Sequence, residues 1–342
     1  MKTFAAVAAL AAASLAHALD VVPPPYQART EIAGVMRVWA NAEMKPLLAR
    51  WEAGFRRLHP HVRIESHLTG SDVGMAGLYA GKADIALLGR AAGASELKAF
   101  EWVYRYKPAR VEIANGGMNE GHAPALVAYV HRDNPIAQLT LTQLDALFSS
   151  ERRRGAPTGL RTWGDLGLTG VWANEPVHLY TFDTESGTGR LFREVVLKDS
   201  RKLYWDRLSE FKDSSPLRPH SHDAGKKILE ALARDRYGLA VAAGPAGAGV
   251  KAVALATAED VNAVAPTREN LVSRRYPLGR SVFAYFNRRP DGPLDAPVAE
   301  FLRYVLSGEG QQLVAKGREY LPLDAATAVA QTSALQQAKR LD

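Results

Sequence analysis

Residues 35–66, VMRVWANAEMKPLLARWEAGFRRLHPHVRIES, contain the clearest pattern of secondary structure in the chain. Its first residues, 35–39, form a short run typical of a β-strand. Residues 44–58 then carry apolar side chains at the spacing of one helical face, namely Leu47, Leu48, Trp51 and Phe55. Residues 61–66 place Val62 and Ile64 on one side, which predicts a second strand. The stretch therefore predicts strand, helix and strand in sequence.

The same alternation continues beyond this stretch. Residues 74–79 indicate a helix and residues 83–88 a third, buried strand. A β-α-β-α-β order implies parallel strands joined by right-handed crossovers. We therefore predict an α/β fold built from mainly parallel sheets with flanking helices.

A change of pattern divides the chain. Glycines and polar residues between Gly116 and Pro124 break any regular element. A new strand is expected at residues 125–131, and the next helix should open at Thr140, where Gln143 completes a capping box. This second α/β series runs to Val253.

The chain then returns to a β pattern at residues 274–285, followed by helices at 296–306 and 309–317 and a partly ordered helical tail at 325–342. We expect residues 19–120 and 276–342 to form one lobe and residues 121–275 to form the other. Two crossings, near residues 116–124 and 274–279, would leave a cleft between the lobes that closes about a hinge.

The N-terminus predicts export. Lys2 is followed by an alanine-rich apolar run at residues 4–15 and by the small-x-small pattern that ends at Ala18. Such a run is shorter than the roughly 20 residues of a membrane span, so a signal peptide, residues 1–18, is favoured over a membrane anchor. The chain has no cysteine, which excludes disulfides, thiolate nucleophiles, cysteine metal sites and a lipid-modified cysteine. We expect a monomeric, soluble protein of the periplasm.

Composition narrows the class of partner. The chain is 47% hydrophobic and 23% charged, which is globular, and its net charge of +7 favours anionic partners. The basic residues are scattered and no aromatic residues interleave with a basic stripe, so nucleic acid is not expected.

The sharpest local signal is DTESGTG, residues 183–189. It follows an expected strand at residues 177–182 and precedes an expected helix at residues 190–197. Gly187 and Gly189 let the backbone approach a ligand, Ser186 and Thr188 offer hydroxyl donors, and the helix N-terminus adds N–H groups and partial positive charge. An oxyanion needs such convergent donors, although an ordinary Ser/Thr helix cap has the same sequence pattern.

Three further turns have the same placement. Residues 69–74 contain Ser71, residues 41–43 contain Ala42 and Glu43, and residues 88–90 end at Arg90. Ligands of open α/β sheets lie beyond the carboxyl ends of the strands, where all four turns are expected.

These residues carry a family resemblance. The chain resembles the phosphate-binding proteins of ABC transporters over nearly the whole mature length. The shared features are Asn41-Ala42-Glu43, Gly70-Ser71, Ala83-Asp84-Ile85-Ala86, Leu139-Thr140, Trp163-Gly164-Asp165-Leu166, Ser186-Gly187-Thr188, Tyr276-Pro277-Leu278, residues 306–312 and Tyr320-Leu321-Pro322. The resemblance implies a two-lobed periplasmic-binding-protein fold of type II, a small oxyanion as ligand with phosphate first, and an ABC permease as partner.

The resemblance also implies the ligand contacts. Ser71, Ser186, Gly187 and Thr188 match as hydroxyl and backbone donors, and Ala42 and Glu43 would contribute backbone N–H groups. The chain departs from the family twice, with Phe182 in place of an arginine and Gly89 in place of the acid that accepts the proton of hydrogen phosphate. We expect Arg90 to replace the lost charge, because a guanidinium suits tetrahedral oxyanions. Glu43, Asp72, Asp183 and Glu185 are the candidates for the acceptor.

Other functions remain as alternatives: a binder of sulfate or an organic phosphate, a secreted hydrolase, or an adhesion protein on the same fold. The pairs His59/His61 and His220/His222 lack the spacing of a helical metal site, and surface positions are expected for them. No Gly-x-Ser-x-Gly surrounds Ser186. We therefore expect a receptor that is not an enzyme and has neither a metal nor a cofactor.

Overall fold

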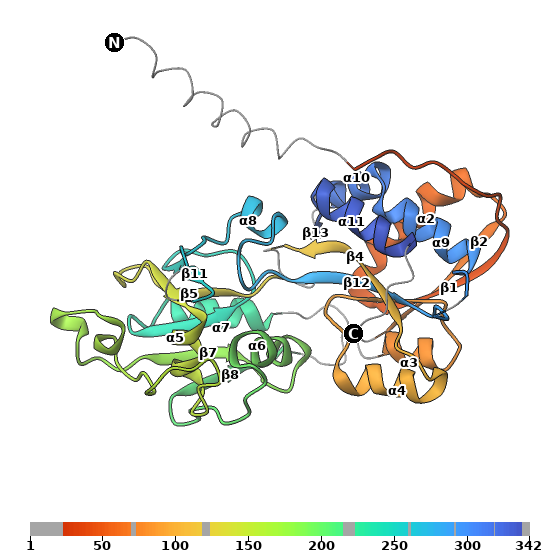
Figure 1. Cartoon of the computed structure of the whole chain (residues 1–342). Coiled ribbons are helices and arrows are strands. Elements are labelled where there is room, and N and C mark those ends of the chain that lie inside the picture. Colours follow the sequence, from red (N-terminus) through yellow and green to blue (C-terminus); the bar gives the residue numbers. More distant parts are fainter. Residues whose placement is uncertain are drawn as a thin grey trace, which may run out of the picture.

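The computed structural model describes residues 23–69, 73–117, 124–214, 223–258, 261–290, 292–317 and 319–336. The predicted signal peptide, residues 1–18, lies outside these ranges. Two main sheets form two lobes that lie side by side (Figure 1). Each lobe has its own buried apolar core.

Lobe 1 is built on a six-stranded sheet in the order β13-β4-β12-β3-β1-β2. Its strands are β1 (Gly34–Asn41), β2 (Val62–Thr69), β3 (Ile85–Leu88), β4 (Ala109–Gly116), β12 (Ser281–Phe286) and β13 (Tyr320–Leu321). One face packs against α2 (Lys45–Leu58), α9 (Ala296–Leu306), α10 (Gly308–Gly317) and α11 (Ala325–Gln336), and the other against α3 (Val73–Tyr79) and α4 (Ala94–Tyr104). Figure 1 shows these two groups of helices on opposite sides of the sheet.

Lobe 2 is built on a five-stranded sheet in the order β10-β5-β9-β7-β8. Its strands are β5 (Val127–His131), β7 (His178–Phe182), β8 (Leu208–Phe211), β9 (Gly238–Ala242) and β10 (Val250–Ala252), and β6 (Gln138–Thr140) pairs separately with β11 (Ala254–Ala256). Its helices are α5 (Leu141–Phe148), α6 (Gly187–Leu197), α7 (Ala224–Leu232) and α8 (Arg268–Val272), with short 3-10 turns η3 (Gly164–Leu166) and η4 (Gly170–Trp172).

The strand directions confirm the α/β prediction and correct one part of it. β1 pairs in parallel with both β2 and β3, as the β-α-β-α-β order predicts. The expectation of mainly parallel sheets is wrong, because β12 is antiparallel to both β3 and β4, and β5 is antiparallel to β9. The reason lies in the crossings: β12 enters lobe 1 at the edge where β4 leaves it, so the two strands run in opposite directions.

Several local predictions are confirmed. Thr140 accepts from Gln143 N at 3.0 Å and Gln143 Oε1 accepts from Thr140 N at 2.9 Å, which is the expected capping box. Trp51 is fully buried in the core of lobe 1. The β pattern over residues 274–285 is correct only from Ser281 onward, because residues 276–280 form the crossing between the lobes. α4 and β4 were not predicted from the sequence.

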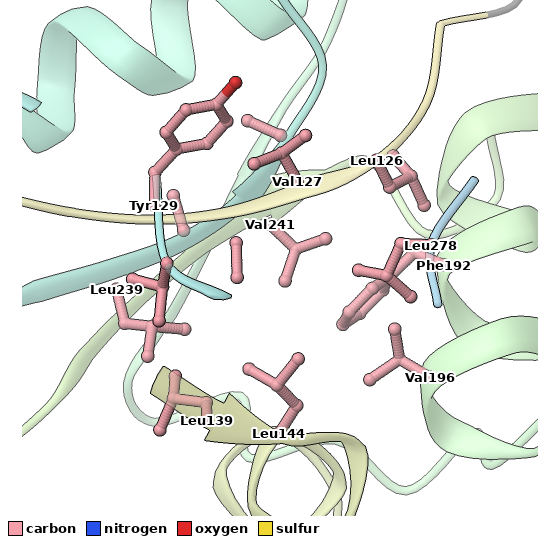
Figure 2. Close-up of a cluster of buried hydrophobic side chains, with 14 of the residues drawn as sticks. Leu126, Val127, Tyr129, Leu139, Leu144, Phe192, Val196, Leu239, Val241 and Leu278 are labelled. Carbon is pink, nitrogen blue, oxygen red and sulfur yellow. The ribbon is translucent and has the colours of Figure 1, made fainter. Parts of the chain in front are cut away.

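The two crossings are tied to each other. Leu126 N donates to Leu278 O at 3.2 Å, and Gly116 N donates to Arg280 O at 2.7 Å. Leu126 and Leu278 lie close to Phe192 of α6 within the core of lobe 2, where Val196 of the same helix faces Leu144 (Figure 2). The packing of α6 is therefore continuous with the chain segments that join the lobes. The limits of the lobes at residues 120/121 and 275/276 stay a prediction.

Candidate functional site

The first part of the site lies where β1 ends. β1 stops at Asn41, and the 3-10 turn η2 (Ala42–Met44) leads directly into α2. Asn41 is buried, with 8% of its surface exposed, and its Oδ1 accepts no hydrogen bond from the part of the chain that the structure describes. Ala42 and Glu43 are partly buried at the entry of the helix, as the sequence predicts.

Arg90 follows β3 at the same sheet edge and is held by a carboxylate. Its Nη1 and Nη2 donate to Glu96 at 2.7 and 2.9 Å, and Nη1 also donates to Ala91 O at 2.9 Å. The side chains of both partners are largely buried, with 14% and 17% exposed. Glu96 in turn accepts from Gly93 N at 2.7 Å. The charge of Arg90 is therefore already balanced within its own turn, and its contact with an anion stays a prediction.

A second arginine, which the sequence analysis missed, lies at this edge. Arg280 directly precedes β12, and its Nε donates to the carbonyl oxygen of Gly89. Burial lowers the pKa of the Arg280 guanidinium to about 10, with a further lowering by Arg90 and opposing effects of Tyr320 and Glu43. A prediction based on the carboxyl ends of strands does not include Arg280, because the antiparallel strand β12 presents its amino end at that edge.

Tyr320 completes this group. It is 1% exposed on β13, next to Gly116 of β4. Burial raises the pKa of its phenol, as does the charge of Glu43, whereas Arg280 lowers it. Glu43, Arg280 and Tyr320 thus act on one another at one end of the six-stranded sheet.

The second part of the site lies in lobe 2, at the N-terminus of α6. The helix begins at Gly187, three residues earlier than the sequence predicts, with Ser186 as its N-cap. Ser186 Oγ accepts from Gly189 N at 3.0 Å and donates to Asp183 O at 2.6 Å. Ser186 therefore does serve as a helix cap. Gly187 and Thr188 are partly buried in the first turn, and Thr188 Oγ1 forms no hydrogen bond within the described ranges.

Gly189 is required by the packing of its own chain. A Cβ on Gly189 would lie 2.0 Å from Asp183 O and 2.7 Å from Thr184 Cα, so the position needs glycine for the close approach of its own chain. This packing accounts for the glycine, and the expectation that Gly189 lets the backbone approach a ligand stays a prediction. Phe182, at the position of the missing arginine, is buried in the core of lobe 2.

The structure locates some of the remaining candidate residues. Ser71 and Asp72 lie outside the described residues, as do His220 and His222. His59 is buried, not on the surface as expected, because Tyr26 Oη lies 2.7 Å from its Nε2 and Phe55 stacks beside it. A cavity of about 300 Å³ between α2, α10 and Tyr26 contains none of the predicted site residues.

Comparisons with known proteins agree with this architecture. Residues 27–309 match the family model of the PBP superfamily domain. The phosphate-binding protein PstS of Pseudomonas aeruginosa is 36% identical over 326 residues, which cover 95% of this chain and 94% of that protein. This chain belongs to the family of these phosphate-binding proteins. Its membership makes it a substrate-binding protein of the periplasmic type.

Solved structures match in fold. PstS from Borrelia burgdorferi gives a TM-score of 0.58 at 14% identity, covering 84% of this chain and 98% of that one. An ABC-type phosphate transport receptor from Vibrio cholerae gives 0.56 at 17% identity, covering 84% and 99%. In the described part of this chain, no helix has the length and apolar character needed to cross a bilayer.

Proposed function

We propose that this protein captures a small tetrahedral oxyanion, with phosphate as the first candidate, for an ABC transporter. The observation that carries the proposal is the composition of one sheet edge. The ends of β1 and β3 and the start of β12 bring Glu43, Arg90 and Arg280 to the same end of lobe 1. The similarity to PstS phosphate-binding proteins supports the choice of anion.

The two lobes would contribute different donors. Lobe 1 would supply Ala42, Glu43, Arg90 and, outside the described residues, Ser71. Lobe 2 would supply Ser186, Gly187 and Thr188 at the N-terminus of α6, where N–H groups and the helix dipole favour an anion. In Figure 1, α6 lies on the side of lobe 2 that is turned toward lobe 1. An anion that contacts both lobes favours the closed state through those extra contacts.

The protein would act as a receptor and not as an enzyme. Ser186 has its hydroxyl engaged with Asp183 O and Gly189 N, and no histidine is bonded to it among the described residues. We further propose that a signal peptidase cleaves after Ala18, that the mature chain is a periplasmic monomer, and that a membrane permease recognises its closed form.

A thermal-shift screen of the mature protein tests the proposal. The ligands are phosphate, sulfate, phosphonates and nucleotides. An anion that binds only the folded protein adds about 2.7 kcal/mol at a hundredfold excess over Kd, which is a clear rise in Tm. No rise with any tetrahedral anion would overturn the proposal. Turnover of a phosphate ester by the same sample would overturn the receptor assignment in favour of a hydrolase.

A further inference from the structure

Arg280 is fixed at both its backbone and its side chain. β12 runs antiparallel to β3 with Phe283 opposite Leu88, so the start of β12 lies beside the end of β3. The carbonyl of Arg280 accepts from Gly116 N at 2.7 Å, and its Nε donates to Gly89 O. The guanidinium is thereby held over the carboxyl end of β3, at the position where the family resemblance places an acid and this chain has glycine.

Across the described residues, Arg280 forms no ion pair, although the charge of Glu43 acts on it. One of its five N–H groups donates to the carbonyl oxygen of Gly89. Its neighbour Arg90 is in the opposite situation, with a two-point pair to Glu96. A partly buried cation is costly unless an anion accompanies it. An oxyanion at this edge would supply the negative charge and would accept hydrogen bonds from the remaining N–H groups of Arg280.

Glu43 is the acid that the fold brings to the same place. β1 and β3 are parallel neighbours with Ala40 opposite Leu87, and the 3-10 turn η2, which follows β1 directly, starts at the same sheet edge as the turn that contains Gly89. Glu43 lies within η2, and its charge acts on both Arg280 and Tyr320.

The other two described candidates for the acceptor, Asp183 and Glu185, lie in lobe 2. Asp183 pairs with Lys212 at 3.4 Å and accepts from Glu185 N at 3.1 Å. Glu185 lies 3.6 Å from Arg193 with 72% of its side chain exposed. Of these three acids, the fold places Glu43 alone beside Arg280.

We propose that Arg280 is the cation and Glu43 the proton acceptor of the oxyanion site, an inference that rests on the function proposed above. An ionised carboxylate can only accept hydrogen bonds. Hydrogen phosphate carries a proton to donate at neutral pH, whereas sulfate carries none and would meet the carboxylate as a like charge. Glu43 therefore selects protonated inorganic phosphate over sulfate, and Arg280 strengthens the binding of both.

Titration calorimetry of the mature protein with phosphate and with sulfate, at neutral pH, separates the two roles. Arg280→Gln should weaken both anions by about ten- to hundredfold, the size of a lost hydrogen bond to a charged group. Arg280→Lys keeps the charge and should recover part of the affinity. Glu43→Gln should weaken the binding of phosphate and strengthen the binding of sulfate. The ratio of phosphate affinity to sulfate affinity should therefore fall by about tenfold or more.

Matched controls keep these outcomes interpretable. Arg275→Gln removes an exposed arginine from the same crossing, and Glu101→Gln removes an exposed acid of lobe 1, so both should bind as the wild type does. Unchanged melting temperatures show that each variant is folded, and Arg280→Lys serves if Arg280→Gln does not fold.

Each result bears on one claim. Wild-type protein that binds neither anion overturns the proposed function and this inference with it. Binding by the wild type with unchanged affinity in Arg280→Gln overturns the role of Arg280 alone. An unchanged phosphate-to-sulfate ratio in Glu43→Gln overturns the role of Glu43 alone.

Discussion

Substituting Gly189 tests how the turn before α6 is built. In Gly189→Ala, the new Cβ would lie 2.0 Å from Asp183 O, whereas ordinary contact begins at 3.4 Å, so the turn must move by about 1.4 Å. The atoms that it meets belong to the backbone of Asp183 and Thr184 and cannot rotate away. Overpacking of this severity costs about 3 kcal/mol, from which the better helix propensity of alanine recovers at most about 1 kcal/mol. We expect a net loss near 2 kcal/mol.

Urea unfolding followed by circular dichroism measures this loss as a lower midpoint at unchanged slope. Gly247→Ala is the control, because that glycine is exposed and no atom lies within 4 Å of its added Cβ. The control should change stability by no more than about 0.5 kcal/mol. If Gly189→Ala proved as stable as the control, the turn would be free to move and the close approach of the chain would not explain the glycine. Affinity for phosphate should also fall in Gly189→Ala, since the displaced turn includes the helix cap.

Three further predictions concern Thr188, Arg90 and Asp145. Thr188→Val keeps the shape and removes one hydroxyl, so calorimetry should show about ten- to hundredfold weaker phosphate binding at unchanged stability; equal affinity would leave the turn as a helix cap alone. Arg90→Ala should weaken anion binding more than Arg152→Ala does, and an equal loss in Glu96→Gln would assign Glu96 the role of positioning Arg90; equal affinities in Arg90→Ala and Arg152→Ala would contradict the role of Arg90. Burial raises the pKa of Asp145 in the folded protein. The stability that its protonated form contributes is therefore fully present below the pKa of the unfolded chain, near 3.9, and is lost as the pH rises through the pKa of the folded protein. The unfolding free energy of Asp145→Asn, relative to wild type, should therefore increase from about pH 3 to about pH 7; a constant difference would contradict this.

Periodicity predicted the local elements well where one face is buried. The helix at residues 296–306 agrees with α9 to the residue, because its large apolar side chains, among them Val298, Phe301 and Leu302, lie in the core of lobe 1. The direction of the strands was not predictable in the same way. A run of apolar residues has the same appearance in a parallel and an antiparallel strand, and the direction of β12 depends on a crossing more than a hundred residues after β4 ends.

The candidate site was predictable only where its residues lie close in sequence. The Ser186 turn carries its own glycines and hydroxyls, so the motif and its place at the start of α6 could be recognised together. Arg280 carries no such signal, since it is one of several arginines in this part of the chain, shortly after Arg274 and Arg275, and becomes distinctive only when β12 brings it to Gly89. The balance of Arg90 by Glu96 was likewise hidden, because a pair six residues apart spans a turn whose shape the sequence does not state.

The bonds of Arg280 also bear on how the lobes would share an anion. Its carbonyl is bonded to Gly116 and its side chain to Gly89, so the guanidinium must move with lobe 1. Thr188 belongs to α6 and must move with lobe 2, because Phe192 and Val196 hold that helix in the core there. An anion could therefore meet Arg280 before closure, whereas its contact with Thr188 would form only as the lobes approach. Charges that act at the first encounter govern the rate of association, and contacts made afterwards govern the rate of release. A site divided between a cation fixed to one lobe and a helix N-terminus fixed to the other would thus link the capture of the anion to closure of the protein around it.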